Sequence, residues 1–106
     1  MNKNKRMRRK IPVLNVSLKE GATYDQLSEI PEMKTLVIET TKNAIIDGIK
    51  KNKKSITLFE IANTTYTIDL DKSQWVTSLE KMIDYYAEKE DYNACISIKD
   101  LIKQIK

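Results

Sequence analysis

The sequence contains no histidine and only one cysteine, Cys95. Without histidine the chain cannot build a Ser–His–Asp triad, a histidine proton shuttle or a histidine-ligated metal site. One cysteine cannot form an internal disulfide or a multi-cysteine zinc site. The two glycines, Gly21 and Gly48, are too few for a Walker A loop or a dinucleotide-binding fingerprint. We therefore expect a protein that is not an enzyme and that has no cofactor, no metal and no small-molecule substrate.

Long hydrophobic runs are also missing. The longest stretches without a charged residue are eight residues long, at 11–18 and 61–68. A membrane-spanning helix needs about 20 apolar residues. No apolar segment of adequate length follows the basic start of the chain, so a secretory signal peptide is not expected either. The sequence predicts a soluble protein of a reducing, intracellular compartment, without a membrane partner.

Positive charge is concentrated in the first ten residues. The whole chain carries 19 basic and 15 acidic residues, for a net charge of +4. Residues 1–10 hold six cations and no acid: Lys3, Lys5, Arg6, Arg8, Arg9 and Lys10. Residues 11–106 carry the other 13 cations and all 15 acids, a net charge of −2. Like charges without apolar partners cannot offset the entropy of ordering, so we predict a flexible basic arm at 1–10 and one domain at 11–106.

The first half of this domain combines an extended and a helical pattern. Apolar residues alternate with polar ones over residues 14–19, which predicts an edge strand with one buried face. The capping-box pair Thr23 and Gln26 predicts a short helix through residue 29. Pro31 suits the first turn of a longer helix that runs to about residue 51. The predicted inward face of that helix consists of Met33, Leu36, Val37, Thr40, Ala44, Ile45 and Ile49.

The second half predicts a β-hairpin followed by a helical hairpin. Residues 56–61 and 66–70 predict two strands joined by a loop at 62–65, and the first strand is apolar nearly throughout, which is typical of a central strand. Asp71 and Asp91 are candidate N-caps of two helices that each carry one apolar stripe. The first stripe consists of Trp75, Leu79, Met82, Ile83 and Tyr86, and the second of Ala94, Ile98, Leu101, Ile102 and Ile105. The short charged interval between these helices predicts an antiparallel helical hairpin over 71–106. The predicted fold class is α+β: a small sheet (edge strand plus β-hairpin) packed against a long helix and the helical hairpin.

The basic arm is the strongest candidate for function, and three interpretations of it remain open. Its cations could neutralise the phosphates of DNA or RNA, which gives salt-sensitive binding without sequence specificity. Its arginines could instead clamp carboxylates on an acidic protein surface. The third interpretation is a solvated terminus without a role. No aromatic residue lies within the arm, so we do not expect it to stack on bases.

Two other groups of residues are candidates for binding. Four lysines follow the long helix: Lys50, Lys51, Lys53 and Lys54. They could form a second patch that binds polyanions, but the favoured interpretation is that they are the solvated end of the helix. Tyr85 is adjacent to a core position and should face away from the core, so we predict that it marks a protein interface, together with Tyr92. We expect Cys95 to be a buried structural thiol, because no base can be named for it.

Residues 79–102 resemble the UVR motif, the helical hairpin of nucleotide-excision repair proteins and some chaperone adaptors. Leu79, Met82 and Ala87 lie near the apolar positions of its first helix. The second helix follows the motif's order with Tyr92, Cys95, Ile98, Lys99, Asp100 and Ile102. Asn93 and Ile96 depart from the motif, which usually has an acid and an alanine there. The resemblance implies pairing between proteins rather than catalysis.

The chain as a whole is similar in style to small accessory proteins of AT-rich tailed phages, including the crAss-like group. It is short, it is rich in isoleucine, lysine and asparagine, and it combines a basic arm with a tyrosine-bearing helical hairpin. This likeness implies a structural or assembly protein of the virion, located in particles or in the host cytoplasm. Its arm would then contact neighbouring subunits or packaged DNA. The alternative is a small regulator that binds nucleic acid through the arm and the lysine cluster.

Overall fold

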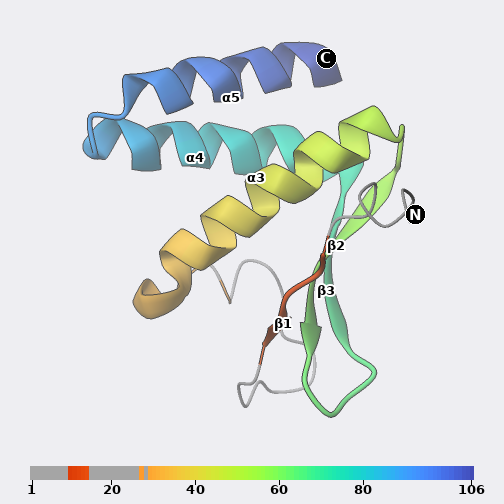
Figure 1. Ribbon diagram of the computed structural model, residues 1–106. Coiled ribbons are helices and arrows are strands. Elements are labelled where there is room, and N and C mark those ends of the chain that lie inside the picture. Colours follow the sequence, from red (N-terminus) through yellow and green to blue (C-terminus); the bar gives the residue numbers. More distant parts are fainter. Residues whose placement is uncertain (1–9, 15–26, 28) are drawn as a thin grey trace, which may run out of the picture.

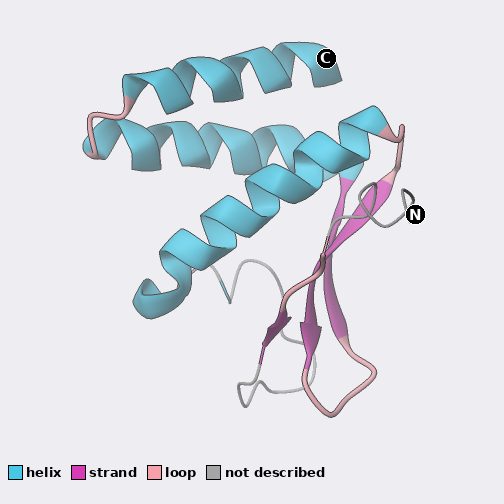
Figure 2. Cartoon of the chain, viewed as in Figure 1, coloured by secondary structure: helices cyan, strands magenta, loops and turns pink. Residues whose placement is uncertain are grey.

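The computed structural model describes residues 10–14, 27 and 29–106. In chain order the elements are β1 (Val13–Leu14), the 3-10 helix η1 (Pro31–Met33), α3 (Lys34–Lys50), β2 (Ser55–Ile61), β3 (Thr67–Asp71), the 3-10 helix η2 (Lys72–Gln74), α4 (Trp75–Glu88) and α5 (Tyr92–Ile105). One sheet, the long helix α3 and a C-terminal helix pair make up the fold, so the predicted α+β class is confirmed (Figures 1 and 2). The flexible arm and the short helix predicted from Thr23 lie outside the described residues, apart from Lys10, Leu27 and Glu29.

The sheet has the order β1-β2-β3, so β2 is central and β1 lies at an edge, as predicted. Of the strand predicted over residues 14–19, Leu14 belongs to β1, and residues 15–19 lie outside the described residues. β1 runs parallel to β2, with Leu14 opposite Ile61. The amide of Glu60 donates to the carbonyl of Pro12 at 3.0 Å, and the amide of Ala62 donates to the carbonyl of Leu14 at 2.8 Å. Parallel neighbours need a long crossover connection, and α3 lies within the chain that connects them.

β2 and β3 form the predicted antiparallel hairpin, but a bulge interrupts their register. Thr57 pairs with Asp69. The next pair is Phe59 with Ile68, so Leu58 is the extra residue on β2. The extra residue shifts the alternation, and Leu58 and Phe59 are both fully buried. β3 alternates between exposed and buried residues, as in a sheet with one buried face. β2 is the central strand, as its apolar run predicted, and the bulge accounts for the two adjacent buried residues in that run.

The hairpin loop extends to Tyr66, which was predicted as the first residue of the second strand. Asn63 takes the left-handed conformation with a φ of 63°. The hydroxyl of Thr64 donates to the carbonyl of Ile61 at 2.9 Å and accepts from the amide of Tyr66 at 3.1 Å. These bonds hold Tyr66 in the turn, where its side chain is exposed instead of joining the buried face.

α3 packs on the sheet with a face that differs in part from the predicted one. Its buried residues are Val37, Ile38, Thr40, Thr41, Ala44, Ile45 and Gly48. Leu36, which the sequence placed on this face, is 42% exposed. At about 100° per residue, the nine positions between Leu36 and Ile45 bring them to opposite sides of the helix. The prediction for Leu36 is wrong, and Ile38 and Thr41 complete the buried face.

The C-terminal helical hairpin forms as predicted, but its first cap differs. The carboxylate of Asp91 accepts a hydrogen bond from the amide of Ala94 at 3.2 Å, so the predicted cap of α5 is confirmed. Asp71 does not cap α4, because it ends β3 and the turn η2 separates it from Trp75. The residue before α4 is Gln74, whose side chain makes no capping hydrogen bond.

A tight turn connects α4 to α5. Glu90 adopts a φ of 60°, and its amide donates to the carbonyl of Ala87 at 2.9 Å. The amide of Asp91 donates to the carbonyl of Tyr86, also at 2.9 Å. This pair of bonds is the Schellman motif, which satisfies the last carbonyls of a helix. Asp91 thus closes α4 and caps α5, which folds the two helices back on each other.

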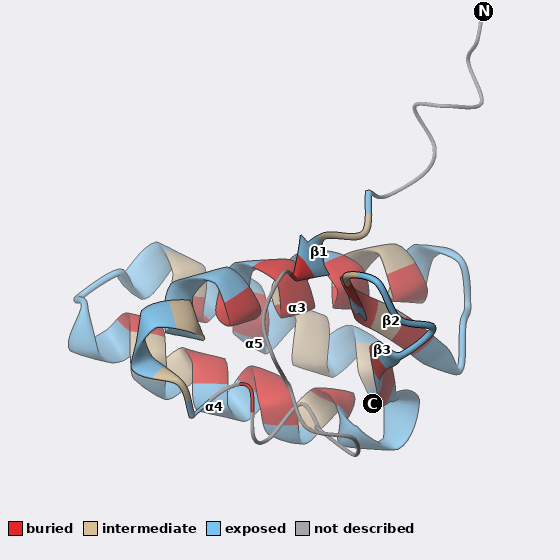
Figure 3. Ribbon diagram, turned by 90° about the horizontal axis from the view of Figure 1, so that it is seen from below, coloured by how far each residue is buried: buried red, intermediate tan, exposed pale blue. Residues whose placement is uncertain are grey.

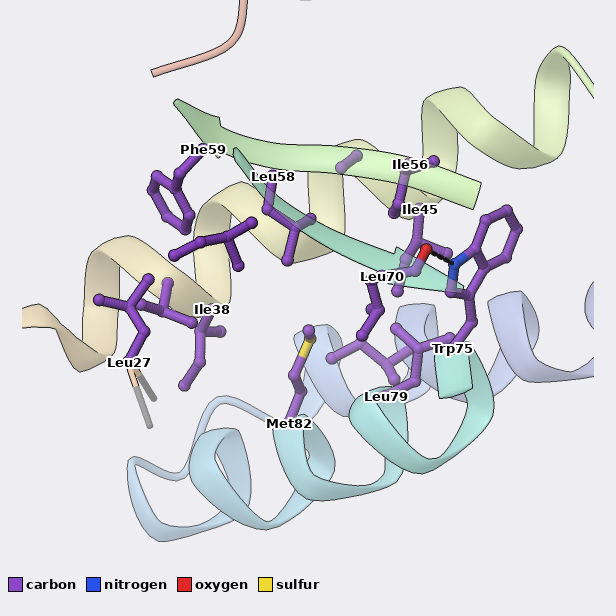
Figure 4. Close-up of a cluster of buried hydrophobic side chains, with 14 of the residues drawn as sticks. Leu27, Ile38, Ile45, Ile56, Leu58, Phe59, Leu70, Trp75, Leu79 and Met82 are labelled. Carbon is purple, nitrogen blue, oxygen red and sulfur yellow. Dashed lines mark hydrogen bonds between the residues drawn. The ribbon is translucent and has the colours of Figure 1, made fainter. Parts of the chain in front are cut away.

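The core lies between α3, the buried face of the sheet and α4 (Figures 3 and 4). Trp75, at the start of α4, is fully buried, and its indole Nε1 donates to the carbonyl of Leu70 at 3.2 Å. Leu79 and Met82 follow on the same face of α4, as the predicted stripe required. The hydrogen bond fixes the indole ring where β3 meets α4, so the first turn of α4 is anchored to the sheet.

Candidate interaction surfaces

The predicted lysine cluster lies where α3 ends. Lys50 is the last residue of α3, and the other three lysines lie in the turn that leads to β2. The amide of Lys53 donates to the carbonyl of Gly48 at 2.9 Å, and the amide of Asn52 donates to that of Ile49 at 3.2 Å. Asn52 occupies the left-handed position of this Schellman motif, with a φ of 54°. The turn reverses the chain, so all four exposed lysines share one end of the molecule.

Lys72 joins this cluster from a distant part of the sequence. Its amide donates to the carbonyl of Lys54 at 2.9 Å, and its Nζ lies 5.9 Å from the centroid of the Trp75 ring. Lys72 was not predicted as part of this cluster, although the predicted hairpin carried the signal, because antiparallel pairing brings the start and the end of a hairpin together. The "lysine end" comprises Lys50, Lys51, Lys53, Lys54 and Lys72, all of them exposed.

Acidic groups moderate the charge of the lysine end without cancelling it. A carboxylate oxygen of Asp47 lies 3.3 Å from the Nζ of Lys51. An exposed pair of this kind contributes little to stability. Asp71 also lies nearby, because it pairs with Ser55 at the start of β2. Five cations against two acids leave a positive surface.

Of the predicted binding residues in the arm, the structure describes Lys10, which is exposed. The other five, Lys3, Lys5, Arg6, Arg8 and Arg9, lie outside the described residues. The three interpretations of the arm therefore stay predictions.

Tyr85 lies at the contact between α4 and α3. Its hydroxyl is 2.9 Å from the hydroxyl oxygen of Thr35. The ammonium groups of Lys34 and Lys89 lie 5.8 Å and 5.0 Å from the centroid of its ring. The ring also meets that of Tyr86 edge-on at 5.1 Å. Tyr85 is partly buried and packs against the core, so the expectation that it faces away from the core is wrong. Its role in an interface with another protein stays a prediction.

Tyr86 is the buried member of this tyrosine pair. Its hydroxyl accepts from the Nζ of Lys42 and donates to a carboxylate oxygen of Glu39, both at 3.4 Å. Burial raises the pKa of Tyr86 above its usual value, and Glu39 adds to the rise, while Lys42 works in the opposite direction. The hydroxyl therefore stays protonated at neutral pH and joins α4 to α3, which is a structural role.

A groove with a volume of about 220 Å³ runs between α3 and α4. Val37, Ile38 and Met82 contribute apolar side chains to it, and two cations and two acids also line it: Lys34, Lys81, Asp84 and Glu88. The balanced charges give no preference for a cationic or an anionic ligand. We therefore assign no ligand to this groove.

The side of α5 that faces away from α4 carries an exposed apolar pair. Tyr92 is 61% exposed and Ile96, one turn later, is 58% exposed. The buried residues of the helix are Cys95 and Ile98, and Cys95 contacts α4 at the carbonyl of Ile83. The "outer face of α5" comprises Tyr92, Asn93, Ile96, Lys99, Asp100 and Lys103, all of them exposed. Tyr92 was predicted as an interface residue from the sequence and Ile96 was not, although its four-residue spacing from Tyr92 could have revealed it.

Cys95 is buried, as predicted, and its Sγ donates to the carbonyl of Ile83 at 3.5 Å. Over residues 10–14, 27 and 29–106, no cluster of three or more cysteine and acidic side chains could hold a metal ion. Among the helices of that same part of the chain, none is both long enough and apolar enough to cross a membrane.

No family model, no curated protein and no solved structure matches this chain. The class that the fold defines is an α+β domain with a mixed three-stranded sheet and a C-terminal helical hairpin. The UVR resemblance of residues 79–102 and the likeness to phage accessory proteins stay predictions.

Proposed function

We propose that this chain is a non-enzymatic protein-interaction module that docks through the outer face of α5. The observation that carries the proposal is the exposed pair Tyr92 and Ile96. Scattered apolar residues on a surface need no explanation, but tyrosine and isoleucine on adjacent turns of one helix offer a continuous anchor. Tyrosine is enriched at protein interfaces, because its ring is apolar and its hydroxyl can hydrogen-bond at the rim.

The proposed setting of this module is a phage particle, as one of its structural or assembly proteins. The domain would dock on other protein subunits, and the basic arm at residues 1–10 would contact neighbouring subunits or packaged DNA. Six cations without an acid suit either partner, because acidic protein surfaces and phosphates both attract them. The composition and the small size of the chain support this setting.

The test is fractionation of purified particles from cells that produce the chain. We expect the chain to sediment with the particles, and we expect Ile96→Glu to remove it from them, because a charge would then be buried at the docking surface. The matched control is Leu36→Glu, which makes the same change at another exposed helical position, on α3. Absence of the native chain from particles would end the virion proposal, and equal loss of both variants would end the assignment to α5.

A second candidate is a small regulator that binds nucleic acid, and the lysine end supports it. Lys72 adds a fifth cation to the four that are close in sequence. Hydrogen bonds in the turn after α3, and the bond from the amide of Lys72 to the carbonyl of Lys54, hold the backbone of this surface. Phosphate contacts of this kind give affinity without sequence readout, and the affinity falls steeply as salt is added. The arm would add further contacts.

Filter binding of duplex DNA across a salt series tests this candidate. We expect the double change Lys53→Glu, Lys54→Glu to lower the magnitude of the slope of log K against log salt by about 2, since each lost phosphate contact removes about 0.9. The control Lys34→Glu, Lys81→Glu alters the charge equally but away from the lysine end, and it should leave most of the slope intact. Removal of residues 1–10 should lower the magnitude of this slope further, because it removes six more cations. Binding by the full chain that is too weak to measure at low salt would exclude this candidate.

A further inference from the structure

The outer face of α5 is complementary to itself when two copies run antiparallel. Its residues change in character along the helix: Tyr92 and Ile96 form an apolar first half, and Lys99 and Lys103 form a basic second half. At about 100° per residue these four positions fall within about 60° of one another. A parallel pair would set lysine against lysine. An antiparallel pair sets the apolar half of each copy against the basic half of the other.

A twofold axis between residues 96 and 97 gives matching contacts along the whole face. Ile96 then meets Ile96 of the second copy near the axis. Tyr92 lies between Lys99 and Lys103 of the second copy, where their methylene stems cover the ring and their ammonium groups reach its face. Asn93 lies opposite Asp100 of the second copy, so the amide can donate to the carboxylate. Each contact occurs twice, as a twofold interface requires.

The charges at the two ends of α5 favour the same arrangement. The turn before α5 is acidic, with Glu90 and Asp91 both exposed, and the second half of α5 is basic. In the antiparallel pair, Lys103 of one copy lies opposite Glu90 of the other. Figure 1 shows the acidic turn and the C-terminal end of α5 at opposite ends of the helix pair. The antiparallel arrangement therefore brings the acidic end of each copy to the basic end of the other, which is electrostatically favourable.

We propose that two copies of this chain associate through antiparallel packing of the outer faces of α5. The inference rests on the proposed function, since it names a second copy as the partner of that docking surface. One pair of helices with 14 residues each buries less than the roughly 1,600 Å² of a standard interface, so the association is weak and reversible. It gains from repetition where many copies are held close together.

Sedimentation velocity of the full chain tests the proposal. Concentrations from about 5 µM to about 500 µM cover the dissociation constants expected of a small interface. We expect the native chain to shift from monomer toward dimer over this range. Ile96→Glu should weaken the association about tenfold or more, because it buries two carboxylates beside each other at the axis. Leu36→Glu, on α3, should behave as the native chain does. A native chain that stays monomeric throughout would overturn the proposal.

Charge reversal tests the antiparallel register itself. Glu90→Lys and Lys103→Glu should each weaken the dimer, because like charges then lie opposite each other across the interface. The double variant restores opposite charges at both ends and should recover the native association. Circular dichroism of each variant checks that the helices remain folded. Dimerisation that is indifferent to all three variants would overturn the proposed register.

The same variants separate this inference from the proposed function. A chain that is monomeric in solution but joins particles in an Ile96-dependent way would refute self-association and leave the interaction module standing. A chain that dimerises through Ile96 but is absent from particles would support self-association and refute the virion setting. The second copy would then be the partner of the docking surface.

Discussion

Truncation of Phe59 to alanine is expected to lower the free energy of unfolding by about 3–5 kcal/mol, and truncation of Leu58 by about 2–5 kcal/mol. Adjacent residues of a regular strand point to opposite faces, so in this sheet with one buried face only one of the two changes would be costly. Here the bulge between Thr57 and Phe59 turns both side chains inward, and both are fully buried. Urea denaturation followed by circular dichroism measures both losses.

Glu60→Ala provides the matched control for these two truncations. Glu60 lies on the same strand, and its side chain is exposed, so we expect a change within about 0.5 kcal/mol. If Leu58→Ala or Phe59→Ala lowered the free energy of unfolding as little as Glu60→Ala does, the two side chains would not both be buried. That result would contradict the bulge in β2.

Most of the fold could be predicted from the sequence because several of its signals are local. The stripe that begins at Trp75 identifies the buried face of α4, and Asp91 marks the start of α5 by a hydrogen bond to a residue three positions on. The hairpin of β2 and β3 follows from two apolar segments with a short loop between them. Such features depend on neighbours in sequence, so periodicity and capping chemistry are sufficient to find them.

The features that were not predicted, or were predicted wrongly, arise where distant parts of the chain decide the outcome. Pairing with β3 determines that Leu58 is the bulged residue, and pairing with β2 decides that β1 is parallel. Leu36 fits a broad apolar stripe in the sequence, but the sheet covers only the arc that includes Ile45. Asp71 satisfies the composition of an N-cap, yet its pairing with Ser55 keeps it in the sheet.

The candidate surfaces follow the same division. The four lysines after α3 are close in sequence and were found, whereas Lys72 reaches them only through the closure of the hairpin. Tyr92 was found as an aromatic residue outside the core, but Ile96 becomes informative only when both residues are exposed on one face. A surface is defined by what the fold leaves uncovered, and the sequence alone carries that information only in part.

The second prediction concerns Gly48, near the end of α3. Judged by helix propensity alone, Gly48→Ala would stabilise the protein by about 1 kcal/mol. A β-carbon at this position would lie 2.8 Å from Cη2 of Trp75 and 2.9 Å from Cγ2 of Ile56, both of them buried. Overpacking of this kind costs about 1–3 kcal/mol. The indole cannot move away freely, because its Nε1 donates a hydrogen bond to the carbonyl of Leu70. We therefore expect a net loss of up to about 2 kcal/mol.

A double-mutant cycle with Trp75→Phe identifies the cause of this loss. Phenylalanine lacks the outer ring atoms that the new methyl group would meet, so in the Trp75→Phe background Gly48→Ala should cost much less or become favourable. Asn43→Ala, at an exposed position of the same helix, should stabilise by a few tenths of a kcal/mol in either background. Thermal and urea denaturation followed by circular dichroism measure all the variants alike. A stabilising Gly48→Ala in the native background would mean that the indole and Ile56 do not pack against Gly48, since these two contacts oppose the gain in helix propensity.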